Sequence, residues 1–550
     1  MKSLFRVISL TAVLFGLLNF FYLVPPVVNW DEGTHAIWGF REWLALKDGN
    51  LVGFWEFARQ QFAYPPLGSW LIALVNFPSE FSITLARFVS TLGFMAAGIL
   101  IFSIGRQLNK NKFAGLSAFF FFISSPIILF YSVVVFKEIW GVALSLLFVF
   151  FYFRAISQKN LLSYFLAGCS LALLFWEKYN YAGLVFLTLV LESIVEWVIV
   201  FANKKNFFLA GKIFLRQLLL FSPLVIFAFW WILTPDNKLE WFLQIMRSDW
   251  NPVTVGLGGK LDYLLFYPNS LRVSYVFSEI LFWLLLTGYL LSIRDLADKK
   301  IRLLFLLFTI NLLLGTRHAV NLQDRYILTT VPGLFLLAGF ELEKTWLFLR
   351  SKRKSKFVKY VICVLFVISG IWMGYDLIKL PWFLKSNATH LLSSAMYEEA
   401  DYHDTIFNFN KQDWPKGELF LRKNAQTSEQ VIDYILDNVD VNKQTEIVGY
   451  MSEIAPDWVE LRMALRRRKC AMSARPAGGY NLQCTNNKNI NNYLVTLEVK
   501  TTSRLYTYDY KRANSWAIPK IKEITENNKG NLLVEKDFQE LGLIVRVYGF

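Results

Sequence analysis

The sequence predicts a polytopic α-helical membrane protein with a small soluble domain at its C-terminal end. Of its 550 residues, 55% are hydrophobic and only 18% are charged, below the quarter that is usual in soluble domains. Apolar runs of membrane-spanning length recur through the first two-thirds, and the composition then becomes polar. We therefore expect a transmembrane domain over residues 1–379 and an extracytoplasmic soluble domain over residues 380–550.

About eleven segments are apolar enough to be transmembrane helices, although several fall short of the 20-residue guideline. The first follows Lys2 and Arg6 and has no small-residue cleavage site, so we interpret it as an uncleaved helix rather than a signal peptide. The segments are 4–24, 82–105, 114–135, 139–156, 161–176, 180–202, 211–234, 276–293, 302–316, 326–342 and 357–378.

The loops between these segments alternate between basic and acidic or mixed. By the positive-inside rule the basic loops are cytoplasmic, so we expect a cytoplasmic N-terminus and an outward-facing C-terminal domain. The net charge of +15 lies largely in the basic loops and indicates topology rather than nucleic-acid binding. The outward loops are 29–64, 136–138, 177–179, 235–275 and 317–325.

The first outer loop contains an apolar stretch, Pro65–Phe77, that is too short to cross a membrane. Counting it as a span would also place Lys110 and Lys112 outside. We interpret Trp55–Phe77 as helices lying on or dipping into the outer interface. Pro65-Pro66 should start the second of them, since proline suits a first helical turn.

The tail has the spacing of a small α/β or α+β domain. Helical periodicity occurs at Thr427–Val439 and Ser452–Lys469, and strand patterns occur at Gly417–Arg422, Thr445–Tyr450, Tyr493–Val499 and Leu541–Tyr548. No Cys/His cluster in the chain has zinc spacing.

The most informative polar motif is Trp30-Asp31-Glu32-Gly33, where two adjacent carboxylates follow the first apolar run. Ionisable groups at a membrane are candidate functional groups because burying them is costly. A base for an acceptor's proton, beside cations that hold a phosphate leaving group, needs carboxylates with Lys and Arg. Further residues of these kinds lie at predicted outer helix ends: Lys137, Glu138, Glu177, Lys178, Tyr179, Arg317, His318, Asp324, Arg325 and Tyr326.

Each of these groups also has a structural explanation. Glu177 and Lys178 could form an ordinary interfacial ion pair, and the arginines could snorkel toward head groups. His318 could be a structural hydrogen bonder, and the two carboxylates at 31 and 32 could belong to a turn. Their convergence on one predicted face favours a reaction site.

At these residues the chain resembles the GT-C superfamily of polyprenyl-phosphate-sugar-dependent glycosyltransferases, in particular the protein O-mannosyltransferases and the lipid A aminoarabinose transferases. The resemblance covers about residues 1–345. Relatives often have Glu-Lys or His before the paired prolines, where this chain has Ala63 and Tyr64. The matching motifs, in family order, are Trp30–Gly33, Tyr64–Trp70, Leu85-Ala86-Arg87, Glu138, Trp176-Glu177-Lys178-Tyr179, and Asp324-Arg325-Tyr326 followed by Pro332.

The resemblance implies a GT-C-like fold and a division of roles among these residues. Asp31 would be the general base, with Glu32 beside it, and Glu138 would support the acceptor or a metal. Lys178 and Arg325 would bind the donor phosphate. Arg317, His318 and Tyr326 are further donor-binding candidates, and Tyr64, Pro65, Pro66 and Trp70 are candidates for the acceptor side of the interface.

The function expected from this set is transfer of a hexosyl or pentosyl group from a polyprenyl-phosphate donor to a lipid, glycan or protein acceptor, with inversion. The motifs point to no definite cofactor, and a divalent cation is a candidate. The resemblance favours a bacterial inner membrane. A transporter or flippase of a lipid-linked or anionic substrate is the main alternative, but such proteins usually show repeats and helices broken near the midplane. A polysaccharide polymerase or ligase acting through loop 235–275 is another.

Overall fold

The computed structural model describes residues 2–23, 30–61, 64–108, 112–202, 207–232, 267–268, 271, 279–318, 324–351, 429–439, 445–448, 462, 480–482, 493–499, 522, 531–539 and 543–549. The chain divides into two compact units, each assembled from separate stretches of sequence. The bundle unit comprises Met1–Val24, Gln61–Gly68 and Arg87–Phe383, and the mixed unit comprises Pro25–Gln60, Ser69–Ala86 and Leu384–Phe550. The domain boundary predicted near residue 379 lies outside the described residues and stays a prediction.

The bundle unit consists of long apolar helices. They are α1 (Lys2–Leu23), most of α5 (Ile83–Leu108), α6 (Phe113–Ile123), α7 (Pro126–Tyr131), α8 (Glu138–Gln158), α9 (Leu161–Glu177), α10 (Tyr179–Ala202), α11 (Phe207–Ile232), α14 (Glu279–Ser292), α15 (Lys299–His318) and α16 (Val331–Ser351), with 3-10 turns η3 (Ile293–Asp295) and η4 (Asp324–Ile327). Each predicted span contains one of them, except 357–378, which is outside the described residues.

Five helices within the described part of the chain are long and apolar enough to cross a membrane. They are Leu4–Phe21, Ile83–Leu108, Glu138–Gln158, Tyr179–Val198 and Gly211–Ile232. The prediction of a multi-pass α-helical membrane protein is confirmed.

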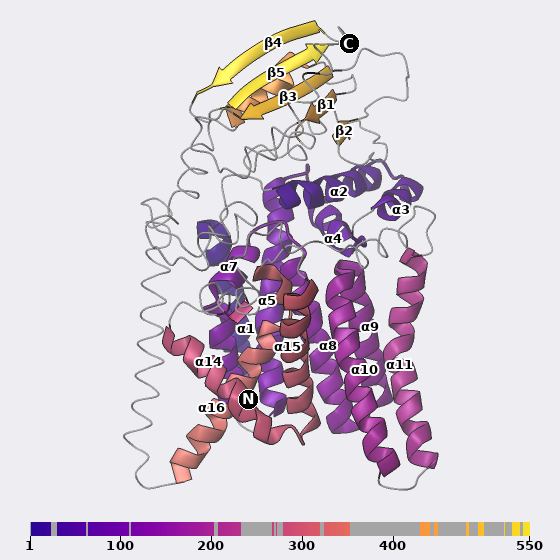
Figure 1. The fold of residues 1–550 in the computed structure, drawn as a ribbon, viewed down its shortest axis with the longest axis vertical. Helices are drawn as coiled ribbons and strands as arrows, with labels where there is room; N and C mark the ends of the chain where they lie inside the picture. The colour runs from indigo at the N-terminus through magenta and orange to yellow at the C-terminus, as the bar shows by residue number, and fades with distance from the viewer. Residues whose placement is uncertain are drawn as a thin grey trace. The chain divides into compact units, whose positions relative to one another are not determined.

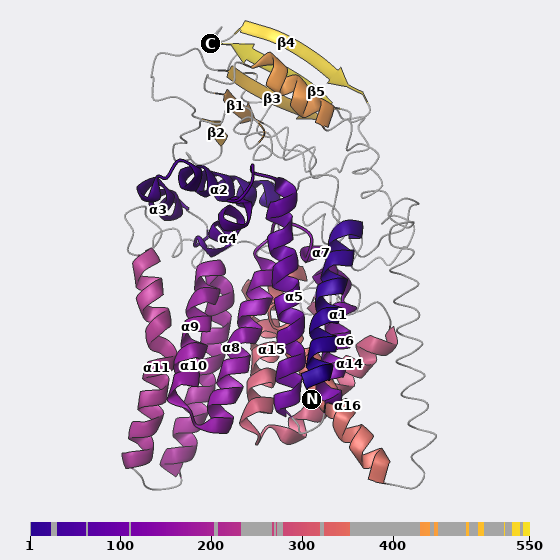
Figure 2. The same ribbon diagram turned by 180° about the vertical axis from the view of Figure 1, so that it is seen from behind.

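Close helix packing organises this unit. Helices α8, α9, α10 and α11 lie side by side (Figure 1), and the view from behind shows the same row (Figure 2). Gly168 of α9 permits one contact, because a Cβ there would lie 2.5 Å from the carbonyl oxygen of Leu220 in α11. Gly339 of α16 likewise lies against the Ala114 carbonyl of α6, where a Cβ would be 2.6 Å away. Small residues at such crossings are typical of membrane helices.

The predicted span 114–135 is interrupted. Helix α6 ends at Ile123, and α7 begins at Pro126. Ser125 between them is extended (φ −77°, ψ 116°), because proline disfavours helical backbone in the residue before it. Pro126 then opens α7, where no backbone N–H is needed. The expectation of one continuous helix here was wrong.

The mixed unit contains helices from the first predicted outer loop. α3 (Leu51–Gln60) and α4 (Leu67–Asn76) occupy the segment predicted to hold two interfacial helices, and Pro66 stands directly before α4 as expected. α2 (Trp30–Lys47) was not predicted as a helix. Trp43 of α2 donates from Nε1 to the Asn76 carbonyl at 3.1 Å and so ties α2 to the end of α4.

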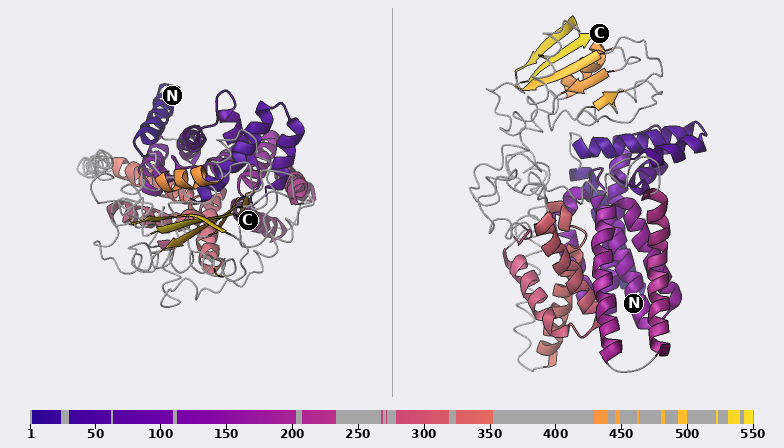
Figure 3. Two further views of the ribbon diagram at one scale, coloured as in Figure 1. Left: turned by 90° about the horizontal axis from the view of Figure 1, so that it is seen from above. Right: turned by 45° about the vertical axis from the view of Figure 1, so that its right-hand side comes forward.

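The C-terminal part of the mixed unit is a five-stranded mixed sheet in the order β2-β1-β3-β5-β4. Figure 3 shows the strands of this sheet as orange and yellow arrows. Among the described strands, β1 and β3 pair in parallel and the other neighbours are antiparallel. The strands are β1 (Thr445–Val448), β2 (Tyr480–Leu482), β3 (Tyr493–Val499), β4 (Asn531–Phe538) and β5 (Leu543–Gly549). A helix over 429–438 packs Tyr434 against Phe538, with ring centroids 5.8 Å apart.

These strands agree with three of the sequence patterns and add two more. Strands β1, β3 and β5 match Thr445–Tyr450, Tyr493–Val499 and Leu541–Tyr548 within the described residues, while β2 and β4 were not predicted. The expected strand Gly417–Arg422 and nearly all of the expected helix Ser452–Lys469 lie outside the described residues.

Candidate functional site

The site begins at a one-residue link between two helices. α9 ends at Glu177, α10 begins at Tyr179, and Lys178 between them is extended (φ −157°, ψ 104°). Helices α9 and α10 pack side by side in the bundle, so the chain reverses direction at Lys178. The link therefore holds a lysine among the ends of several helices, where its side chain is 4% exposed.

Two cations from distant parts of the chain meet one carboxylate. Lys178 donates from Nζ to Oε1 of Glu138 at 2.6 Å, and Nε of Arg325 lies 3.7 Å from the same oxygen. Glu138 is the first residue of α8 and is 1% exposed. The N-terminal end of a helix favours negative charge, which stabilises a carboxylate in this buried position together with the two cations.

Tyrosines complete the surroundings of Lys178. Nζ of Lys178 lies 3.4 Å from the hydroxyl of Tyr181 on the first turn of α10. That hydroxyl donates to the backbone carbonyl of Arg325 at 3.1 Å and so connects α10 to η4. The rings of Tyr181, Tyr64 and Tyr326 lie 4.7, 5.5 and 6.0 Å from Nζ, within the range of cation–π attraction.

The segment before α4 forms another wall. Lys137 donates from Nζ to the backbone carbonyl of Pro65 at 2.7 Å, and it lies 5.4 Å from the ring of Tyr64. The Tyr64 and Tyr179 rings are 6.2 Å apart. Pro65 and Pro66 are both buried. The backbone carbonyl of Pro65 therefore holds the Lys137 ammonium group in place, one residue before Glu138.

A second carboxylate, Glu177, is also buried here at 1% exposure. It lies just beyond the apolar segment 161–176. The pKa of Glu177 is raised to about 7, chiefly by burial; Lys137 and Lys178 oppose the rise, and the charge of Glu138 adds to it. The described site therefore contains three cations, Lys137, Lys178 and Arg325, and two carboxylates. Glu138 and Glu177 are the carboxylates, and Glu177 binds a proton readily near neutral pH.

The structure brings together part of the predicted set. Glu138, Lys178, Arg325, Tyr326 and Tyr64 converge with the paired prolines in the bundle unit. Trp70 belongs to the mixed unit, where its ring lies 5.9 Å from Phe54 and 6.0 Å from Trp55.

For some other predicted residues the structure describes the helix but not the side chain. Asp31 is on the first turn of α2, and Arg317 and His318 end α15, but their side chains are outside the described residues. Glu32 follows Asp31 in α2 and is fully buried in the mixed unit. Their place in the reaction stays a prediction.

Sequence reasoning gave Lys137 and Glu177 no role and did not consider Tyr181. Lys137 precedes Glu138, and Glu177 precedes Lys178, so each stood beside a residue that was assigned one. Tyr181 lies three residues after Lys178, the spacing that places two side chains on the same face of a helix. That spacing is the signal that could have identified it.

The described residues do not by themselves provide a metal centre. Within them, no group of three or more His, Cys, Asp or Glu side chains is placed to hold a metal ion. Glu138 and Glu177 supply carboxylates, but Glu138 already binds Lys178. A divalent cation therefore remains a prediction from the sequence.

Comparison with known proteins establishes the architecture. A scan of protein-family models and a search of curated proteins give no match. Among solved structures, ArnT from Cupriavidus metallidurans is similar at 10% sequence identity, covering 100% of this chain and 97% of that one. The TM-score is 0.56 for its apo state and 0.54 for its complex with undecaprenyl phosphate. The fold is GT-C-like.

A further similar structure is the oligosaccharyltransferase from Archaeoglobus fulgidus, at 14% identity, with a TM-score of 0.44 over 70% of this chain and 58% of that one. The GT-C-like fold predicted from the sequence motifs is confirmed by the ArnT likeness. In that fold, the described cluster is built from the ends of α8, α9 and α10 and from η4.

Proposed function

We propose that this chain is an integral-membrane glycosyltransferase that moves a sugar from a polyprenyl-phosphate donor to a lipid, glycan or protein acceptor. One observation carries the proposal: two buried cations, Lys178 and Arg325, meet at the carboxylate of Glu138. ArnT, whose fold is similar, is seen bound to undecaprenyl phosphate. A phosphate bound beside Glu138 would give the two cations a second anionic ligand, through charge-assisted hydrogen bonds.

The two cations would act on the leaving group. As the bond between the anomeric carbon and the phosphate oxygen breaks, negative charge grows on the phosphate. Lys178 and Arg325 would stabilise this charge more in the transition state than in the ground state, which is the condition for catalysis. Glu138 would keep both cations aimed at the phosphate, and the Tyr181 hydroxyl would hold the backbone of Arg325 in place.

The acceptor would attack in a single displacement. Asp31 would take the proton from the acceptor hydroxyl or amine while the phosphate leaves from the opposite face, which inverts the anomeric centre. A second, nucleophilic carboxylate is not needed, in contrast to retaining glycosidases. The accompanying proposals are a bacterial inner membrane location, a cytoplasmic N-terminus, and an outer-face reaction in contact with membrane lipids.

Turnover by purified protein in detergent micelles tests this function. The substrates are radiolabelled undecaprenyl-phosphate hexoses and pentoses, offered with membrane lipid, glycan and peptide acceptors. Lys178→Ala should lower product formation about a hundred- to a thousandfold. Lys299→Ala is the matched control, because Lys299 pairs with Glu196 in a different cluster. Micelles separate no compartments, so product formed there cannot come from a transporter; absence of product with every donor would reject the proposal.

A further inference from the structure

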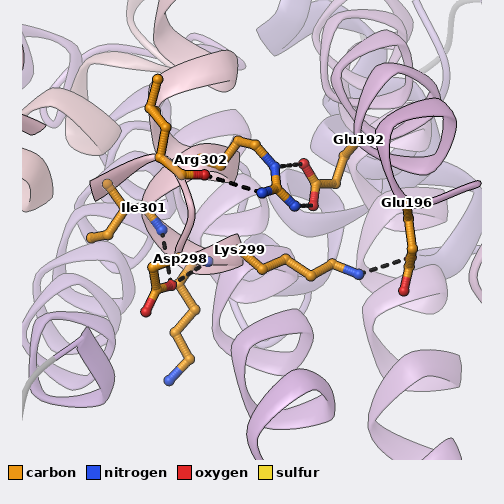
Figure 4. Close-up of polar contacts among 8 residues, drawn as sticks. Glu192, Glu196, Asp298, Lys299, Ile301 and Arg302 are labelled. Atoms are coloured by element: carbon orange, nitrogen blue, oxygen red, sulfur yellow. Dashed lines mark hydrogen bonds and ion pairs between the residues drawn. The ribbon is translucent and has the colours of Figure 1, made fainter. Parts of the chain in front are cut away.

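Among the buried glutamates described in the bundle unit, Glu138 and Glu343 each have one oxygen without a hydrogen-bond partner, but their other oxygen accepts a hydrogen bond. Glu177 has no described hydrogen bond to either oxygen. Within the described part of the chain, its Oε2 atom is buried and has no hydrogen-bond partner. Glu192 is equally buried, yet both its oxygens accept from Arg302 at 2.7 Å (Figure 4). Glu343 accepts from the Ala114 amide at 2.7 Å. A buried carboxylate oxygen without a partner carries a desolvation cost, and a bound hydrogen-bond donor would remove it.

The position of this carboxylate is determined by a glycine. A Cβ at residue 68 would lie 3.1 Å from Oε1 and 3.3 Å from Oε2 of Glu177, and 3.4 Å from Cε of Lys137. The carboxylate therefore rests directly against the Cα of Gly68. The same segment holds Lys137 through the Pro65 carbonyl. Backbone packing rather than an ion pair thus keeps the Glu177 carboxylate in place.

Its neighbours indicate what the bound donor would be. Lys178 follows Glu177 in the chain, and Lys178 and Lys137 both act on its charge. A group beside the phosphate of a polyprenyl-phosphate sugar faces either the prenyl chain or the sugar. The prenyl chain has no hydrogen-bond donor, whereas a sugar carries several hydroxyls. The surplus of cations over carboxylates in the site disfavours an ammonium group there.

We propose that Glu177, held by Gly68, is the donor-sugar subsite and accepts hydrogen bonds from hydroxyl groups of the transferred sugar. The inference rests on the glycosyltransferase function proposed above. In this scheme Lys178 and Arg325 bind the donor phosphate. Glu177 selects among donor sugars. A carboxylate built to bind a hydroxyl discriminates strongly against a donor that lacks it, because its own oxygen then stays buried and unpaired.

The test compares binding of the two parts of the donor. Affinity for undecaprenyl phosphate, which has no sugar, and for the best undecaprenyl-phosphate sugar is measured by tryptophan fluorescence for wild type, Glu177→Ala and Glu177→Gln. Glu177→Ala should weaken binding of the sugar-bearing lipid about ten- to a hundredfold and leave the sugar-free lipid unchanged. Equal weakening of both lipids would overturn the proposal, because the carboxylate would then act on the phosphate.

Deoxy donors supply the second measurement. In wild type, kcat/KM should fall at least about tenfold for one monodeoxy sugar, and Glu177→Ala should remove that difference. Gly68→Ala should reduce the same discrimination while every charge is retained, and Glu196→Gln, at a pair outside the site, should leave it intact. Undiminished discrimination in Glu177→Ala would overturn the assignment.

Failure of the proposed function gives a different result. In that case wild type would neither bind nor turn over any undecaprenyl-phosphate sugar, whereas failure of this inference alone leaves turnover intact. Size-exclusion elution in detergent confirms that each variant is folded. If Glu177→Ala does not fold, Gly68→Ala and Glu177→Gln carry the same comparison.

Discussion

Nζ of Lys178 lies 2.6 Å from Oε1 of Glu138, so the single residue that links α9 to α10 is paired with the first residue of α8. Arg325, in a turn still later in the chain, approaches the same oxygen. Three helix ends and a 3-10 turn therefore share one charged centre. The function proposed for the chain depends on this centre.

The two cations should act as a unit. Lys178→Ala and Arg325→Ala should each lower kcat about a hundred- to a thousandfold, since each removes stabilisation of the developing phosphate charge. The double variant should lose less than the product of the single losses, because the residues share a partner. A double-mutant cycle on turnover measures the coupling, and NMR of the product should show an inverted anomeric centre. Retention of configuration, or two silent single variants, would exclude the mechanism.

Replacing the proposed base should separate chemistry from binding. Asp31→Asn cannot accept the acceptor's proton and should reduce turnover about a hundred- to ten-thousandfold, with donor affinity preserved. Glu32→Gln should cost less. Steady-state turnover and fluorescence titration with the donor measure the two effects. A greater loss at Glu32 would exchange the two roles, and near-normal turnover by Asp31→Asn would reject the assignment.

Glu177 should give the reaction a pH dependence near neutrality. Burial raises the pKa of this carboxyl to about 7, so it is protonated below that pH and charged above it. The charged form is the better acceptor for sugar hydroxyls, so kcat/KM for the donor should fall about tenfold per pH unit below 7. In Glu177→Gln, kcat/KM should not show this fall below pH 7. Identical profiles for the two proteins would contradict the prediction.

A second cluster should contribute to stability rather than to turnover. Arg302 of α15 binds Glu192 of α10 with two hydrogen bonds, and Glu192 is 1% exposed (Figure 4). Arg302→Ala would leave a buried charge without its partner and should destabilise the protein by about 3–5 kcal/mol. Lys299→Ala breaks a more exposed pair with Glu196 and should cost at most about 1 kcal/mol. Unfolding in detergent compares the two, and equal losses would show that burial is not decisive here.

The topology predicted from charge can be tested without activity. Single-cysteine variants at Lys110 and Asn387, in a background without the four native cysteines, should differ in labelling of intact cells by an impermeant thiol reagent. Asn387 should react and Lys110 should not, because the basic loop at 110 is expected in the cytoplasm. Labelling of both, or of Lys110 alone, would refute the orientation.

The sequence determined the class of this protein and the location of most of its helices. Apolar length predicts a span wherever it occurs, because a bilayer imposes one thickness on every crossing helix. Proline has equally local effects, so the start of α4 after Pro66 was predictable. The break at Pro126 has the same local cause, but the apolar run around it concealed the break. Strands β1, β3 and β5 carry clear patterns, whereas the three residues of β2 are too few to form one.

The partners of the charged residues were decided only by the tertiary structure. Adjacency in sequence suggested that Lys178 pairs with Glu177. In the fold, α9 ends at Glu177 and Lys178 is extended, and the lysine binds Glu138 from α8. The Glu177 carboxylate lies instead against Gly68, from a segment more than a hundred residues earlier in the chain. Pairings of this kind depend on which helix ends meet, and that is set by packing along the whole length of the helices, which no local pattern encodes.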